Sequence, residues 1–137
     1  RIDSLQTLDE ASDVMYERLG IKEPLKEFDV MELYFPSSWS GVMWPEDLKL
    51  AKRGEGAKLV ADGITDMDGE LPINPSGGVT SSNPIGATAI TRVAECALQI
   101  MGKGGKRQVP DAKLSLATGF GGCSWSDVTI LGAKKPN

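Results

Sequence analysis

Two glycine-rich segments carry the groups in this sequence that could stabilise negative charge on a reacting carbonyl. In the first, a bend at residues 74–78 (Asn-Pro-Ser-Gly-Gly) leads to Asn83, which precedes a predicted helix. A helix start presents free N–H groups that favour a developing negative charge. In the second, residues 119–122 (Gly-Phe-Gly-Gly) can bring the Gly121 amide close to a ligand, because glycine has no Cβ to block the approach. A capped turn and an ordinary hairpin would give the same two patterns, and both are more common than a site.

Two further side chains, Tyr34 and Cys123, could take part in chemistry, although each also has a plain structural role. Tyr34, at the end of a predicted strand, could donate a proton if it were buried, but a tyrosine at a strand edge more often only packs. Cys123 could act as a nucleophile only if its thiolate were stabilised. Cys96 lies among apolar residues of a predicted helix, as a core residue would.

The composition excludes several classes of function. The 137 residues include no histidine, so a histidine base, triad or metal ligand is absent, and two cysteines cannot form a zinc site alone. Against 19 Asp and Glu there are 15 Lys and Arg without a long basic run, so no nucleic-acid partner is expected. No apolar run approaches the roughly 20 residues that span a bilayer, so we expect no membrane span. The chain also lacks a secretory signal and a disulfide pattern, which favours a reduced, cytoplasmic location.

The pattern of apolar residues predicts helices and strands in a layered α/β arrangement within one domain, residues 1–137. The expected elements are helix 4–19, strand 28–34, a weaker helix 37–50, a polar excursion 51–70, helix 84–101, and strands 113–118 and 128–131. The apolar side of helix 84–101 is expected to comprise Ile85, Ala89, Val93, Cys96, Ala97 and Ile100.

Several residues are expected to set the ends of these helices. Asp3 or Ser4 should cap the first helix, and Pro45 should lie in a first turn or at a break. Asn83 should cap the helix at 84–101, with Pro84 as its first residue.

The order and content of these motifs resemble the C-terminal half of the thiolase superfamily over nearly the whole chain. The family carries an N-x-x-G-G bend where this chain has residues 74–78, and a G-H-P-x-G-A-[ST] motif where it has residues 82–88. The subgroup it most resembles is the archaeal and bacterial acetyl-CoA acetyltransferases akin to sterol carrier protein thiolases. The resemblance implies one half of the five-layered α/β/α/β/α thiolase fold, with a mixed sheet flanked by helices, in a chain that is part of a longer protein.

The sequence also departs from the family at its catalytic positions. Asn83 replaces the histidine that activates the nucleophile, and asparagine can donate a hydrogen bond but cannot act as a base near pH 7. Gly119 aligns with the second catalytic cysteine, while Gly121 still matches the residue whose backbone N–H joins an oxyanion hole. The nucleophile itself belongs to the N-terminal half of the family.

The resemblance implies an acyl-CoA C-acyltransferase that performs thiolytic cleavage or Claisen condensation of a 3-oxoacyl-CoA. A coenzyme A thioester would be the substrate, with no cofactor or metal bound by this chain. Asn83 and the Gly121 amide would stabilise oxyanions and Tyr34 would donate a proton. The missing histidine and cysteine suggest an atypical acyl group, aromatic or branched, or an aldolase-like retro-cleavage, and residues 1–137 alone should be inactive.

The alternative is a catalytically degenerate thiolase-like subunit that serves as a scaffold or binds acyl-CoA or lipid. Under either hypothesis, the resemblance implies the N-terminal thiolase half as a partner, a homodimer, and a small zinc-containing OB-fold protein as a further partner. Half of a two-fold-repeated core would otherwise expose a large apolar face.

Overall fold

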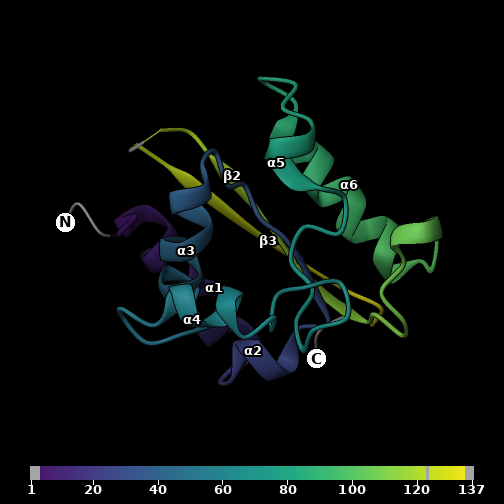
Figure 1. The fold of residues 1–137 in the computed structure, drawn as a ribbon, viewed down its shortest axis with the longest axis horizontal. Helices are drawn as coiled ribbons and strands as arrows, with labels where there is room; N and C mark the ends of the chain where they lie inside the picture. Colours follow the sequence, from purple (N-terminus) through teal and green to yellow (C-terminus); the bar gives the residue numbers. More distant parts are fainter. Residues whose placement is uncertain (1–3, 123, 135–137) are drawn as a thin grey trace.

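Residues 4–122 and 124–134 are described by the computed structural model, and they form a mixed sheet with helices against it (Figure 1). The strand order is β1-β2-β3, in which β1 (Val30–Glu32) is parallel to β2 (Leu114–Phe120) and β2 is antiparallel to β3 (Ser126–Gly132). The predicted mixed sheet is therefore confirmed. The strand expected at 28–34 is shorter than predicted, whereas β2 and β3 both extend further toward the hairpin that joins them.

The segment around Ile73 pairs with the other edge of β1. Met31 forms a parallel bridge with Ile73, its N–H donates to the Pro72 carbonyl (3.0 Å), and the Asn74 N–H donates to the Met31 carbonyl (2.8 Å). This pairing brings the bend at 74–78 beside the end of β1.

Helices cover the sheet on both faces. Helix α1 (Gln6–Leu19) packs against β3, and helix α6 (Thr88–Ile100) packs against β2 and β1. The five central residues of β2 are all buried, as expected for a strand that is covered on both sides. The core on the α1 side is built from fully buried side chains, which include Leu8, Met31, Leu33, Leu48, Leu71 and Leu116. Within the described ranges, no helix is long and apolar enough to cross a bilayer.

Helix α1 ends as predicted but begins differently. Gly20 closes it in the left-handed conformation, with φ of 71°. The expected cap at Ser4 is wrong, because Leu5 occupies the cap position, and Asp3 lies outside the described residues. Instead, Asp47 accepts hydrogen bonds from the Leu5 N–H (3.0 Å) and the Ser4 hydroxyl (2.9 Å). A carboxylate distant in the sequence therefore satisfies the start of the helix.

Short helices connect these elements. Helix α2 (Pro24–Glu27) precedes β1, helix α3 (Ser38–Asp47) follows it, and helix α4 (Gly56–Ala61) lies within the region expected to be a polar excursion. The expected position of Pro45 is wrong, because it lies inside α3 near its C-terminal end. Proline cannot donate to the carbonyl four residues earlier, but a capping box between Ser37 and Ser40 secures the other end of this helix.

The chain before α6 also differs from the prediction. Residues Gly78–Ser81 form a short additional helix, α5, and α6 begins at Thr88. Ala87 is the cap residue, so the expected roles of Asn83 as cap and Pro84 as first helical residue are wrong. A turn closed by the Ala87 N–H and the Pro84 carbonyl (2.8 Å) occupies this place instead.

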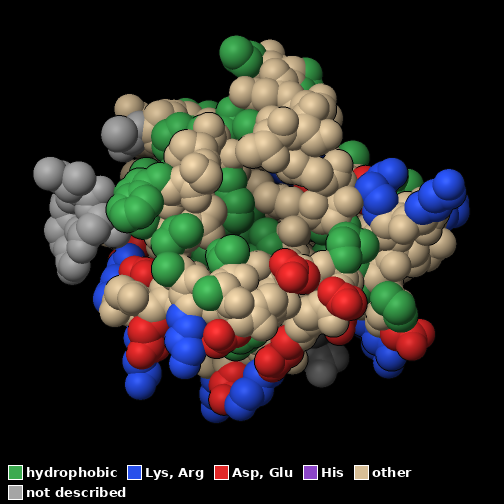
Figure 2. Space-filling model, viewed as in Figure 1, with side chains coloured by type: hydrophobic (Ala, Val, Ile, Leu, Met, Phe, Trp, Pro, Cys, Tyr) green, Lys and Arg blue, Asp and Glu red, His purple; other side chains and the backbone are tan. Residues whose placement is uncertain are grey.

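Helix α6 turns a largely polar face toward the sheet. Its buried residues are Thr88, Arg92, Glu95, Cys96 and Gln99, of which only Cys96 belongs to the predicted apolar side. Ile90, by contrast, is 64% exposed, and Ile85 just before the helix is 90% exposed. The uncharged stretch from residue 71 to residue 91 lies around α5 and the start of α6, and Figure 2 shows this upper region free of charged side chains.

Candidate functional site

Asn83 and Tyr34 lie together beyond the end of β1. The Asn83 side-chain oxygen accepts a 2.6 Å hydrogen bond from the Thr88 hydroxyl, and the Tyr34 hydroxyl lies 3.5 Å from the same oxygen. Two donors therefore face the carbonyl end of the Asn83 amide. Its NH2 group is left to point elsewhere, and this exposed group can donate to an oxyanion.

Tyr34 is fixed by its backbone and by its ring. Its N–H donates to the Thr118 hydroxyl (2.8 Å), and the preceding residue, Leu33, donates its N–H to the Asn74 side-chain oxygen (2.6 Å). The Tyr34 ring packs against Phe120 with centroids 5.8 Å apart, and Phe120 packs against Trp44 at 5.1 Å. The half-buried tyrosine therefore presents only its hydroxyl end to Asn83.

The Gly121 amide is engaged within the β2–β3 hairpin. Its N–H donates to the Trp125 carbonyl (3.0 Å), and a Cβ on Gly121 would lie 1.8 Å from the Trp125 indole. The indole therefore covers this glycine. In this conformation the hydrogen is not free for an oxyanion, so the predicted role of Gly121 requires the hairpin to open. Cys123 lies outside the described residues.

Phe120 connects this hairpin to the other predicted site residues. It directly precedes Gly121 in the chain, and its ring contacts Tyr34, whose hydroxyl faces Asn83. The structure therefore brings Asn83 and Tyr34 together, whereas Gly121 is linked to them only through its chain neighbour Phe120.

Gly119, the position aligned with the family's second cysteine, has little room for a side chain. A Cβ there would lie 2.9 Å from an Asp127 carboxylate oxygen and 3.1 Å from the Ala89 Cβ. Asp127 is directly opposite Gly119 in the β2–β3 register. An aspartate therefore takes the space into which a cysteine would project, on the face of the sheet covered by α6.

A buried ion pair lies next to this site and was missed in the sequence. Glu32, the last residue of β1, pairs with Arg92 of α6 at 2.9 Å, and both side chains are at most 5% exposed. Burial raises the pKa of Glu32, although hydrogen bonds from Ser76 and the charge of Arg92 act against the shift. A glutamate between Met31 and Leu33 in the predicted strand was the signal that could have revealed the pair.

Thr88 was also missed. Its hydroxyl orients the Asn83 amide, and this threonine is only 2% exposed. Thr88 occupies the final [ST] position of the family motif at residues 82–88, and that position was the signal that could have revealed it.

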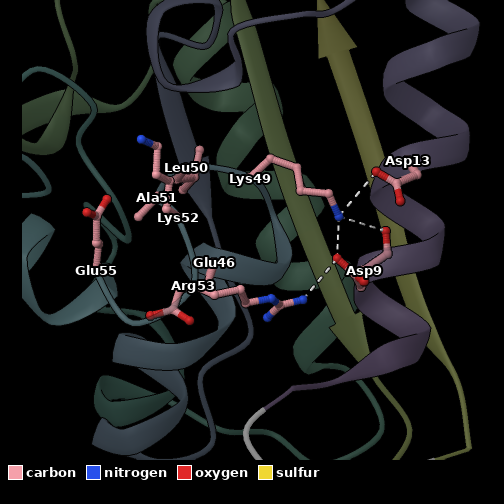
Figure 3. Close-up of a pocket in the computed structure, with 9 residues that line it drawn as sticks. All are labelled: Asp9, Asp13, Glu46, Lys49, Leu50, Ala51, Lys52, Arg53 and Glu55. Atoms are coloured by element: carbon pink, nitrogen blue, oxygen red, sulfur yellow. Dashed lines mark hydrogen bonds and ion pairs between the residues drawn. The ribbon is translucent and has the colours of Figure 1, made fainter. Parts of the chain in front are cut away.

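A broad depression of about 750 Å³ lies on a different part of the molecule, between α1 and the segment that follows α3 (Figure 3). Two of its three cations, Lys49 and Arg53, are already engaged. Lys49 pairs with Asp9 and with Asp13 (3.2 Å), and Arg53 pairs with Asp9 (3.2 Å) and with the buried Asp47. This network ties α1 to the end of α3, and we interpret it as structural.

The described residues contain no group of three or more metal-ligating His, Cys, Asp or Glu side chains. The buried thiol of Cys96 is also a poor nucleophile, because burial raises its pKa to about 12.

Comparison with known proteins first identifies the class. The model of the thiolase C-terminal domain-like family matches residues 4–133. A solved structure described as the Ltp2-ChsH2(DUF35) aldolase has the same fold, with a TM-score of 0.75 and 22% identity, and the match covers 93% of this chain and 32% of that one.

Curated relatives show the same assignment. The chain is 39% identical over 97 residues to an acetyl-CoA acetyltransferase of Methanothermobacter thermautotrophicus, which covers 70% of this chain and 25% of the relative. It is 40% identical over 113 residues to sterol carrier protein 2 of Homo sapiens, which covers 82% of this chain and 20% of the relative. This chain therefore belongs to the thiolase C-terminal domain-like family and spans about a quarter or less of these relatives.

Proposed function

We propose that this chain is the C-terminal domain of a thiolase-like acyl-CoA C-acyltransferase, which cleaves or forms a carbon–carbon bond in a 3-oxoacyl-CoA. An N-terminal half supplies the nucleophile, and a coenzyme A thioester is the substrate. The observation that carries the proposal is the orientation of Asn83. Its oxygen faces Thr88 and Tyr34, so its NH2 group is directed away from them as a hydrogen-bond donor.

The proposed roles follow from this geometry. The Asn83 NH2 group donates to the oxyanion of the thioester or enolate, and removing one such donor typically costs about 10²- to 10³-fold in kcat. Tyr34 donates a proton, for which its hydroxyl is close to Asn83. Gly121 contributes its amide only after its hydrogen bond to Trp125 opens.

The outer surface of α6 supports the proposed N-terminal half as a partner. Ile85, just before α6, and Ile90, in its first turn, are 90% and 64% exposed, and the stretch 71–91 that contains them carries no charge (Figure 2). A neighbouring domain that packs there would bury these side chains. A homodimer and a small zinc-containing OB-fold partner also belong to the proposal, and the solved relative is described as an assembly with a DUF35 protein.

The experiment is acetoacetyl-CoA thiolysis by the complete protein in which this domain is joined to its N-terminal half. Asn83→Ala should lower kcat by at least 100-fold, in line with the loss of an oxyanion donor. Ser82→Ala, at the exposed neighbouring position, is the matched control and should keep kcat. If Asn83→Ala keeps the wild-type kcat, Asn83 has no role in the mechanism.

A second candidate function is a degenerate subunit that binds acyl-CoA or lipid without turning it over. The structure of the hairpin favours it. The Gly121 N–H, one of the two predicted oxyanion donors, is already hydrogen-bonded to Trp125, and the Trp125 indole covers it. Calorimetric binding of an acyl-CoA by a protein that shows neither thiolysis nor carbon–carbon cleavage would support this alternative.

A further inference from the structure

The buried Glu32 and Arg92 and the half-buried Ser76 form a closed set of hydrogen bonds, which we call the clamp. The Glu32 carboxylate accepts the Ser76 N–H (2.9 Å) on one oxygen, and the Ser76 hydroxyl (2.7 Å) and Arg92 (2.9 Å) on the other. Arg92 also donates to the Ser76 hydroxyl oxygen at 2.8 Å. Each member therefore contacts both of the others.

The clamp joins three separate segments of the chain. Glu32 ends β1, Ser76 lies in the bend at 74–78, and Arg92 belongs to α6. Ser76 also accepts the Gly78 N–H at 3.1 Å, so the turn into α5 is attached to the same group. The clamp thus fixes where the bend and the helix sit relative to the strand.

The distance along the chain from Glu32 to Tyr34 is close to the distance along α6 from Arg92 to Thr88. Tyr34 follows Glu32 by two residues, about 6.6 Å along an extended chain. Thr88, which holds Asn83, precedes Arg92 by four residues, about 6 Å along a helix and on the same helical face. From the contact of Glu32 with Arg92 to that of Tyr34 with the Asn83–Thr88 group, the step along the chain that leaves β1 is therefore close to the step along α6.

This match makes the position of Asn83 sensitive to the clamp. A shift of α6 by one residue would move Thr88 by about 1.5 Å along the helix and turn it by about 100°. Either displacement would separate the Asn83 oxygen from the Tyr34 hydroxyl, which already lie 3.5 Å apart. A buried charge pair resists such slippage, because breaking it leaves a charge unpaired.

We infer that Glu32, Ser76 and Arg92 are positioning residues that hold Tyr34 and Asn83 in register for the reaction. The inference rests on the proposed function and adds residues that do not touch the substrate. Loss of the clamp should therefore reduce the chemical step more than substrate binding.

The test uses the complete protein and the mild substitution Ser76→Ala, which removes one donor to Glu32 while leaving the ion pair. Thr80→Ala is the matched control, because this exposed hydroxyl donates only to the Gly77 carbonyl nearby. Ser76→Ala should lower kcat at least fivefold with KM within twofold, whereas Thr80→Ala should change neither. Arg92→Lys should recover part of the kcat lost in Arg92→Met, because it restores the charge.

Structures of the two alanine variants separate this inference from the proposed function. The Tyr34–Asn83 pair should move apart in Ser76→Ala and stay in place in Thr80→Ala. An unmoved pair, or an unchanged kcat in Ser76→Ala, would overturn the positioning role. A wild-type protein that lacks thiolysis and carbon–carbon cleavage would overturn the proposed function, while the pair's position in Ser76→Ala would still decide whether the clamp sets the register.

Discussion

The Thr88 hydroxyl donates a 2.6 Å hydrogen bond to the side-chain oxygen of Asn83. The same hydroxyl lies 3.1 Å from the Pro84 carbonyl, so the first residue of α6 closes the turn that carries Asn83. Because Thr88 is buried and Asn83 is exposed, the donor is fixed while the amide it orients remains accessible.

Replacing Thr88 by valine should therefore impair turnover. Valine has nearly the same shape but no hydroxyl, so the Asn83 amide loses its orientation. A lost hydrogen bond of about 1 kcal/mol corresponds to a roughly five- to tenfold lower kcat. Steady-state thiolysis by the complete protein measures the effect, and Thr88→Ser, which keeps the hydroxyl, is the control. Equal kcat for the valine and serine variants would contradict the orienting role.

Asp47→Ala should destabilise the domain strongly. This carboxylate is fully buried, and it accepts from the start of α1 and from Arg53. Its removal leaves the buried Leu5 N–H and the Ser4 hydroxyl without their acceptor, which should lower the free energy of unfolding by about 1–3 kcal/mol. Urea denaturation followed by circular dichroism measures the change.

The matched control for this prediction is Asp13→Asn. Asp13 is 63% exposed and pairs with Lys49 at 3.2 Å, so its loss should cost about 0.5 kcal/mol or less. Similar losses of unfolding free energy in the two variants would show that the contacts of Asp47 stabilise the domain no more than a surface ion pair does.

Cys96 should resist alkylation in the folded protein. Burial raises its pKa from 9.0 to about 12, so at pH 9 its thiolate fraction is about 500-fold lower than that of an exposed cysteine. In a Cys123→Ser background, iodoacetamide labelling at pH 9 should be slow until urea unfolds the chain. Rapid labelling without urea would mean that α6 leaves the sheet.

The same shift predicts a loss of stability at alkaline pH. The folded pKa is raised, so the contribution of Cys96 is fully present below pH 9 and declines as pH rises toward about 12. Cys96→Ala should reduce this dependence, which urea denaturation between pH 8 and pH 11 would detect. An identical pH dependence in the variant would exclude Cys96 as its source.

Gly119→Ala should destabilise the hairpin because of crowding. The new methyl group would meet the Asp127 carboxylate and the Ala89 Cβ, and overpacking of this kind costs about 1–3 kcal/mol. Asp127→Ala should relieve part of the cost, which a double-mutant cycle of unfolding free energies would reveal as a favourable coupling. Additive costs would show that Asp127 does not fill this space.

The sequence predicted those elements whose signals are local. The spacing of apolar residues located α1, and the left-handed Gly20 closed it as expected. Alternation and glycine located β2 and β3, although Gly119 and Phe120 were assigned to a turn and instead belong to β2. Their ladder partners, Asp127 and Ser126, lie on another strand and could not be known from the local sequence.

The features that were missed depend on contacts between distant residues. Asp47 replaces a local cap of α1 from 42 residues away, and Arg92 pairs with Glu32 across 60 residues. Of the predicted site residues, Asn83 and Tyr34 do lie together. The hydrogen bond from Gly121 to Trp125 follows from the conformation of the hairpin, which the glycine pattern alone does not specify.

The polar inner face of α6 has a consequence for protein engineering. A redesign guided by hydropathy would replace the exposed Ile90 by lysine and the buried Gln99 by leucine. Gln99, however, donates to the Arg107 carbonyl and accepts from the Val109 N–H, both at 2.8 Å. Leucine at position 99 would leave the Arg107 carbonyl and the Val109 N–H without these hydrogen bonds. Lysine at position 90 would place a charge on the surface that we propose binds the N-terminal half. Such a redesign would therefore weaken both the packing of α6 within this domain and its proposed contact with the N-terminal half.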